Sequence, residues 1–100
     1  MATYKLSIIS PDGQIFQDQV ESLVVPGQEG WMGILANHAP LVAALKKGVL
    51  KLSGPGIEKF YSILSGVLEV NASHEALVLA DEAFEAATLQ EAQSKLYGSK

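Results

Sequence analysis

The chain has 100 residues, of which 48% are hydrophobic, and it carries a formal net charge of −4 with an isoelectric point near 5.0. This length suits a single domain, and the acidic balance excludes the basic surface that nucleic acid binding requires. The sequence has no cysteine, which excludes disulfides and thiolate metal sites, and its apolar runs are far shorter than the ~20 residues that cross a bilayer, so we expect no direct membrane insertion.

The first quarter of the chain predicts antiparallel strands. Apolar and polar residues alternate with period two from Tyr4 to Ile8, and Pro11-Asp12-Gly13 then supplies the fixed φ, the side-chain acceptor and the glycine of a turn. Residues 15–25 continue the strand pattern. We expect Pro26-Gly27 to interrupt it.

The segment from Glu29 to Leu41 combines glycines, the sole tryptophan, a histidine and a proline in one apolar stretch. Gly30 and Gly33 permit positive φ, and Pro40 fixes its own φ and favours an extended conformation in the residue before it. This composition is unlike that of an ordinary strand. We therefore expect a shaped loop here.

Two hairpins are predicted in the second half of the chain, because alternating runs flank short turns rich in glycine, proline, asparagine and serine. Their strands are expected at residues 49–53 with 57–63, and at residues 67–70 with 75–80. Many short strands with regular turns predict a mostly β fold, namely a flattened sandwich or barrel of about eight to ten short antiparallel strands.

A short helix is predicted near the end of the chain, where alanine, glutamate, glutamine and leucine dominate. Thr88 stands three residues before Glu91, which is the spacing of a capping box. Leu89 and Leu96 fall on one face of the helix, and Gly98 is expected to end it. A helix this short is only marginally stable on its own. We therefore expect it either to dock on the rest of the domain or to fray.

Residues that could carry chemistry lack a recognisable arrangement. The residue types of a hydrolytic triad occur at Ser62, Ser65, His74, Asp81 and Glu82. No Gly-x-Ser-x-Gly elbow and no phosphate-binding glycine motif is found. His38 either holds its own loop in place through a hydrogen bond to a backbone carbonyl or contacts a partner. His74 lies in a distant turn, without the spacing of a metal site. We therefore predict no catalytic residue, no metal and no cofactor.

Two features of the central segment are candidates for contact with a partner. Trp31, beside Met32, either fills space in the core (a core plug) or serves as an amphipathic anchor at an interface. We expect its side chain to be partly exposed. Lys46 and Lys47, before Gly48, form a positive pair that is typical of a solvated turn. A functional role for this pair would require an acidic patch on the partner.

Residues 29–41, with Pro26-Gly27 before them and Lys46-Lys47-Gly48 after them, resemble the signature of the epsilon subunit of bacterial rotary ATP synthases, which is called delta in mitochondria. Three other segments also resemble strands of that family, at residues 6–13, 65–70 and 78–81. The likeness extends over roughly residues 4 to 83.

This resemblance implies a non-catalytic subunit in the central stalk of a proton-translocating ATP synthase. Such a subunit couples rotation between the membrane c-ring and the catalytic sector through the gamma subunit. The resemblance also implies a peripheral location on the cytoplasmic face of the bacterial inner membrane.

The resemblance also implies which residues form the interfaces. The residues towards the c-ring are Glu29, Trp31 and His38, and those towards gamma are Ser10, Val42 and Ala43. Many relatives have an acidic or polar residue where this chain has Trp31, so Glu29 is expected to supply the charge. The small side chain of Ala43 either allows close approach by gamma or packs in a strand crossing.

Family members usually carry a longer helical hairpin after the sandwich, whereas this chain stops within what resembles its first helix. We divide the chain into a β-sandwich domain at residues 1–84 and the start of a helical segment at residues 85–100. Either the tail has been removed or the form is naturally short, and contact with the catalytic subunits or inhibition of ATP hydrolysis would require a longer tail. Some members bind ATP through an arginine-rich motif, but residues 88–93 contain no arginine, so we expect no nucleotide binding.

Two alternatives belong to other functional classes. One is a free-standing β-sandwich module that binds a peptide or small ligand by adding a strand at a sheet edge. The other is a small hydrolase, which has no supporting motif. Co-purification with gamma separates the binding module from a stalk subunit, and turnover of generic esters would reveal a hydrolase.

Overall fold

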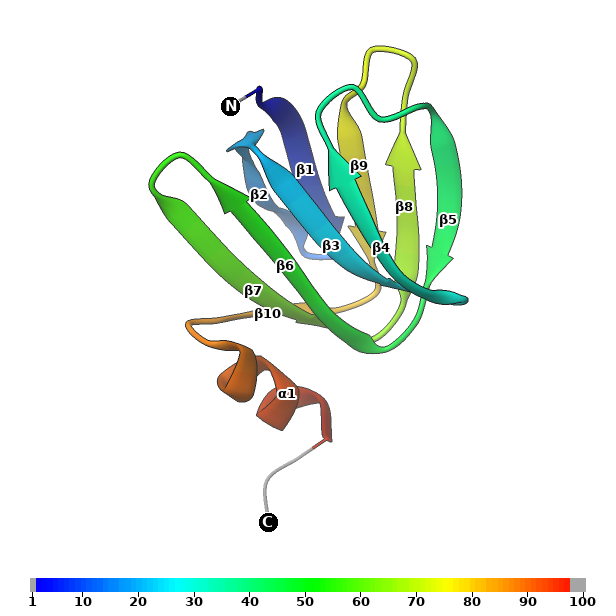
Figure 1. The fold of residues 1–100 in the computed structure, drawn as a ribbon. Helices are drawn as coiled ribbons and strands as arrows, with labels where there is room; N and C mark the ends of the chain where they lie inside the picture. Colours follow the sequence, from blue (N-terminus) through cyan, green and yellow to red (C-terminus); the bar gives the residue numbers. More distant parts are fainter. Residues whose placement is uncertain (1, 98–100) are drawn as a thin grey trace.

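The computed structural model describes residues 2–97 of the chain. In this part, ten strands curl into two facing layers around an apolar core, and one helix lies at one end of the sandwich (Figure 1). The elements are β1 (Tyr4–Ser10), β2 (Gly13–Val20), β3 (Ser22–Gly27), β4 (Gly30–Leu35), β5 (Leu41–Leu45), β6 (Gly48–Gly54), β7 (Ile57–Ile63), β8 (Gly66–Val70), β9 (Ala76–Ala80), β10 (Ala83–Ala86) and α1 (Leu89–Tyr97). The predicted mostly β class with a short C-terminal helix is confirmed.

The strands form one continuous sheet in the order β10-β7-β6-β3-β5-β8-β9-β1-β2, and β4 pairs with β3 beside this path. β3 meets β5 through the single pair of Gly27 and Leu45. The sheet folds there, with β10, β7, β6, β3 and β4 in one layer and β5, β8, β9, β1 and β2 in the other. β1 and β9 run parallel, unlike the antiparallel strands that we predicted. No hairpin joins these two strands to each other, because β1 continues into β2 and β9 is reached from β8.

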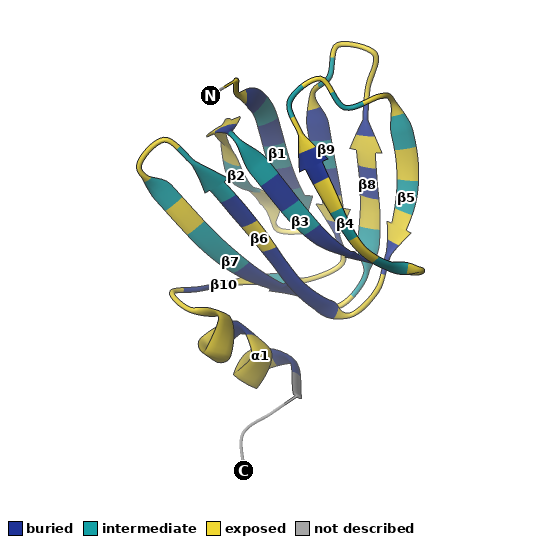
Figure 2. Ribbon diagram, in the orientation of Figure 1, coloured by how far each residue is buried: buried dark blue, intermediate teal, exposed yellow. Residues whose placement is uncertain are grey.

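The interior is filled by apolar residues that alternate along the strands, as Figure 2 shows. On β6, Leu50 and Leu52 are fully buried while Lys51 between them is exposed. On β8, Leu68 and Val70 are buried in the same way. The period of two along a strand produces this separation, and burial of apolar area at about 25 cal/mol per Å² is the main source of stability.

The segment that we expected to be a shaped loop is partly a strand. β4 occupies residues 30–35 and pairs with β3 along its whole length. Glycine does not mark a loop throughout this segment: Gly30 has a φ of 130° beside the turn at residues 28–29, but Gly33 lies in ordinary strand geometry. The connecting loop is therefore confined to residues 36–40.

Pro26-Gly27 does not interrupt a strand as predicted, because both residues belong to β3. β6 pairs with β3 only at residues 22–24, so Pro26 stands where the ladder to β6 has already ended and no amide donor is needed. Two further strands were not predicted, β5 and β10. The apolar run of β5 hides its alternation, and β10 is only four residues long.

α1 begins where the sequence predicts. Thr88 Oγ1 accepts a hydrogen bond from the Glu91 N–H at 3.1 Å, and Glu91 Oε1 accepts one from the Ala87 N–H at 2.9 Å. These bonds satisfy amide groups that the helix start would otherwise leave free. The predicted end at Gly98 lies outside the described residues. Within residues 2–97, no helix has both the length and the apolar character needed to span a membrane.

The helix docks on β6, β7 and β10 rather than standing free. Its buried residues are Ala92 and Leu96, and Ser62 Oγ on β7 donates a hydrogen bond to the Ala92 carbonyl oxygen at 2.5 Å. Leu89 remains 47% exposed. Of the two leucines predicted on one face of the helix, Leu96 is thus buried against the sandwich and Leu89, in the first turn, is not.

Candidate partner-binding surfaces

The β3–β4 hairpin brings two predicted interface residues together at its tip. Glu29 is exposed in the turn, and Trp31 follows at the start of β4 with 66% of its surface exposed. Trp31 points outward because side chains alternate along β4, where Ile34 points into the core. The expectation of a partly exposed tryptophan is confirmed, and the core-plug alternative is excluded.

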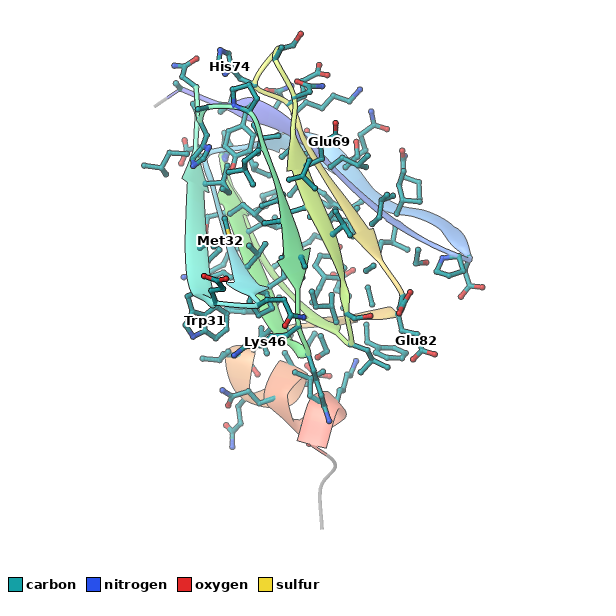
Figure 3. The ribbon with its side chains drawn as sticks, turned by 90° about the vertical axis from the view of Figure 1, so that its right-hand side faces the viewer. Trp31, Met32, Lys46, Glu69, His74 and Glu82 are labelled. Carbon is teal, nitrogen blue, oxygen red and sulfur yellow. The ribbon has the colours of Figure 1, made fainter. Side chains whose placement is uncertain are left out.

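His38 lies beyond the opposite end of β4. Because a strand rises about 3.3 Å per residue, the six residues of β4 separate it from the hairpin tip by about 20 Å. The His38 ring is half-buried, and its Nδ1 lies 2.8 Å from the Ala39 carbonyl oxygen. The His38 carbonyl oxygen lies 3.0 Å from Nδ1 of His74, in the turn between β8 and β9. Figure 3 shows Trp31 and His74 at opposite ends of the sandwich. His38 thus ties two loops together, far from Glu29 and Trp31.

The outer surface of the second layer carries a row of apolar residues across four strands, which we call the apolar face together with Val42 beside it. The neighbouring row is mixed, with Glu69 and Ser7 beside Val42 and Leu77. The strand register aligns Ala44 on β5, Val67 on β8, Leu79 on β9 and Ile9 on β1 in one row. Val42 stands beside this row with 72% of its surface exposed, and Leu79 is 47% exposed. A row of exposed apolar side chains across several strands is a candidate site of protein interaction.

The structure separates the residues that were predicted to face gamma. Val42 belongs to the apolar face. Ala43 follows it on β5, is half-buried and pairs with the fully buried Leu68, so its side chain points towards the interior. Ser10 lies at the end of β1, where its Oγ accepts a hydrogen bond from the Asp12 N–H at 3.3 Å.

Two members of the apolar face, Val67 and Leu79, were not singled out from the sequence. A signal was present, because Val67 on β8 and Leu79 on β9 are large apolar residues at outward positions where a solvated sheet face would be polar. The alignment of these positions with β5 and β1 depends on pairing between distant segments, so it was visible only in the folded chain.

The residue types of a hydrolytic triad are not assembled. Ser65 Oγ donates a hydrogen bond to Asp81 Oδ2 at 2.6 Å, and the Ser62 hydroxyl is buried under α1. Figure 3 places His74 and Glu82 at opposite ends of the sandwich. Within residues 2–97, no three side chains of His, Asp or Glu are grouped so that they could hold a metal ion.

Two buried tyrosines have raised pKa values. Burial raises the pKa of Tyr61 to about 12, and the neighbouring Glu85 carboxylate acts in the same direction. Burial also raises the pKa of Tyr4. The Tyr61 ring meets Phe16 edge to face with 6.5 Å between ring centroids. Both tyrosines belong to the core, so these shifts reflect packing.

The fold and its surfaces define a class of protein, a small β-sandwich with a row of apolar residues exposed on one outer surface. Residues 3–86 match the family described as the ATP synthase, Delta/Epsilon chain, beta-sandwich domain. The chain belongs to this family, as the sequence resemblance indicated. Membership identifies residues 3–86 as a β-sandwich domain of the delta/epsilon type of ATP synthase subunit.

Two bacterial relatives have similar sequences. The chain is 40% identical over 93 residues to the ATP synthase epsilon chain of Dichelobacter nodosus, in an alignment that covers 92% of this chain and 64% of that relative. It is 39% identical over 93 residues to the ATP synthase epsilon chain of Rhodopseudomonas palustris strain BisB18, covering 93% of this chain and 68% of the relative. The chain thus spans about two thirds of the length of these curated relatives.

Two solved structures have similar folds. A chain in the cryo-EM structure of the Euglena gracilis mitochondrial ATP synthase, which shows OSCP, F1 and the c-ring, matches with a TM-score of 0.80 and 28% identity over 95% of this chain and 61% of that one. A chain in the central stalk and c-ring structure from Tetrahymena thermophila matches with a TM-score of 0.74 over 83% of this chain and 66% of that one. Its identity is 12%, so the second match shows the fold alone.

Proposed function

We propose that this chain is the epsilon subunit of an ATP synthase central stalk and that it joins the gamma subunit to the membrane c-ring without catalysing a reaction. The observation that carries the proposal is the apolar face, because it lies on a domain of the ATP synthase delta/epsilon family and needs a partner to cover it. The likeness to a chain of an assembled mitochondrial ATP synthase supports the same role.

Gamma is proposed to bind the apolar face. Val42 is its most exposed large side chain, and Val67 lies in the row between Ala44 and Leu79. Ser10, at the end of β1, is proposed to lie at the edge of the gamma contact. Ala43 points inward, so we propose that it contributes by letting β5 pack closely beneath the interface.

The c-ring is proposed to contact the tip of the β3–β4 hairpin. Glu29 offers an exposed carboxylate there, and Trp31 offers an exposed indole, a side chain that is enriched at interface hot spots. His38 lies at the other end of β4 and is engaged with its neighbouring loops. We therefore propose that His38 positions these loops and that the ring contact is restricted to the hairpin tip.

Two separated contacts on one small domain suit the transmission of rotation. A close-packed interior has low compressibility, so a displacement imposed on one face is passed to the other with little loss. Since the c-ring lies in the membrane, the proposal places this chain at the membrane periphery, on the cytoplasmic face of the bacterial inner membrane.

The proposal is tested by placing a charge in the apolar face. Val67→Arg puts a guanidinium group where gamma would cover it, and an unpaired buried charge is costly. Co-purification of the chain with co-expressed gamma is expected to fall at least about tenfold, which corresponds to ~1.4 kcal/mol of binding free energy. Circular dichroism of the isolated variant verifies that the sandwich still folds.

Leu35→Arg is the matched control, because Leu35 on β4 is 61% exposed but lies outside the apolar face. This variant is expected to retain gamma. If folded Val67→Arg protein retains gamma as well as the control does, the apolar face is not the gamma site.

A further inference from the structure

A groove of about 590 Å³ lies between the β3–β4 hairpin, the outer surface of β6 and the first turn of α1. Trp31, Phe60 and Leu89 supply large apolar side chains to its lining. Trp31 is 66% exposed, and Leu89 is 47% exposed although its helix is docked. Figure 3 shows Trp31 beside α1 at the end of the sandwich where Lys46 also lies. The groove is distinct from the apolar face, which lies on the other layer.

The charge of the groove is opposite to that of the chain. Three of the seven basic residues, Lys46, Lys47 and Lys51, line the groove. Within the part of the chain that the structure describes, no aspartate or glutamate lines it, although the net charge of the chain is −4. Lys51 Nζ lies 6.0 Å from the centre of the Phe60 ring and 3.2 Å from Glu58 Oε2 on the neighbouring strand. Cationic groups therefore stand directly beside the apolar lining.

We propose that this groove binds an acidic amphipathic segment of a partner protein. The apolar side chains of the segment pack between Trp31, Phe60 and Leu89, and its carboxylates lie against Lys46 and Lys51. Complementary charge of this kind directs the approach of a partner and fixes its register.

The exposure of the lysines favours a peptide over a small anion. Sites for small molecules enclose most of the ligand and place a few polar groups around it. Lys46, Lys47 and Lys51 are all exposed, at the margin of an apolar surface. A rim of charge around an apolar centre is the arrangement of a protein interface. The inference requires neither gamma nor the apolar face. It shares Trp31 with the proposed c-ring contact, and it goes beyond that contact through Phe60, Leu89 and the lysines, which the proposed function does not use.

Trp31 provides a direct assay, because it is the sole tryptophan. The probe is a synthetic amphipathic peptide of about 14 residues, or four helical turns, with leucines on one face and glutamates on the other. Added to the whole chain, it is expected to shift the Trp31 emission to shorter wavelength in a saturable manner, with an affinity that falls as salt rises. The same peptide with lysine for glutamate is expected to give no saturable shift.

Charge reversal in the groove provides the decisive variant. The double variant Lys46→Glu with Lys51→Glu is expected to weaken binding of the acidic peptide at least about tenfold and to allow binding of the basic peptide. Lys5→Glu makes the same kind of charge change on β1, in the other layer, and is expected to leave binding unchanged.

Several outcomes would overturn the proposal. One is an absence of any saturable shift with the acidic peptide, and another is equal binding by the double variant. A Trp31 shift produced by sodium pyrophosphate, with displacement of the peptide, would assign the groove to a small anion. Self-association of the chain that the double variant abolishes would assign it to a second copy. None of these results affects the Val67→Arg assay with gamma, so failure of the two proposals can be told apart.

Discussion

Tyr4 and Tyr61 are both buried in the core, but their hydroxyl groups differ in hydrogen bonding. Tyr4 Oη donates to the Ile34 carbonyl oxygen at 2.7 Å, which links β1 to β4. Tyr61 Oη has no partner with hydrogen-bond geometry among the described residues, although the Glu85 carboxylate lies near enough to help raise the pKa of Tyr61. A buried polar group that has lost water without gaining a partner lowers stability, whereas a satisfied one contributes to it.

Replacing each tyrosine with phenylalanine tests this difference. Tyr4→Phe is expected to lower the free energy of unfolding by about 1–2 kcal/mol, because the hydrogen bond to Ile34 is lost. Tyr61→Phe is expected to change it by less than about 0.5 kcal/mol or to raise it, because only an unsatisfied hydroxyl is removed. Urea unfolding followed by circular dichroism measures both values. Equal losses in the two variants would show that the Tyr61 hydroxyl is satisfied in solution.

Single residues were predicted from the sequence to different extents. The exposure of Trp31 was expected from its neighbours, but only the alternation along β4 excluded the core-plug alternative. The long-range contact at His38 could not be predicted, because the His74 ring meets the His38 backbone carbonyl oxygen across 36 positions of the sequence. Ala43 was assigned to an interface by resemblance, and its inward orientation became evident only from its pairing with Leu68.

Local signals account for the elements that were predicted. The β6–β7 and β8–β9 hairpins follow from alternating residues around short turns, and the start of α1 follows from the capping spacing of Thr88 and Glu91. β4 and β10 carry weaker local signals and are held by pairing to β3 and β7. The parallel pairing of β1 with β9 has no local signature at all, because it joins the two ends of the sandwich sequence.

Close packing between β8 and β9 requires a glycine at position 66. A β-carbon added there would collide with the Leu79 carbonyl oxygen and lie 3.1 Å from the Ala80 Cα. Both neighbours are backbone atoms of a paired strand, so they cannot move aside without disturbing the sheet. At Gly33 on β4, by contrast, an added β-carbon meets nothing within 4 Å.

Alanine at these two glycines gives a matched comparison. Gly66→Ala is expected to lower the free energy of unfolding by about 1–3 kcal/mol, because the clash forces strands apart. Gly33→Ala is expected to be neutral or to stabilise by up to about 1 kcal/mol, because alanine restricts the unfolded chain. Thermal unfolding of both variants measures the difference. A loss at Gly33 as large as that at Gly66 would contradict the role of close packing.

The whole molecule combines a close-packed sandwich with separate surfaces that we propose for protein partners. The family could be recognised from the sequence, because the segment around Trp31 and its flanking strands resembles the epsilon pattern. The apolar face could not be recognised from the sequence, because its residues come from four strands that lie far apart along the chain. The groove beside α1 likewise needs β3, β6 and the helix to be brought together.

Site-specific photo-cross-linking in the assembled synthase tests the central claim most directly. A photoreactive phenylalanine derivative is placed at position 67 in one variant and at position 31 in another, and each cross-linked partner is identified by mass spectrometry. The account predicts that position 67 links to gamma and that position 31 links to a c-ring subunit. Cross-links from both positions to one and the same partner, or assembly of the synthase with neither position linked, would contradict a subunit that bridges the two.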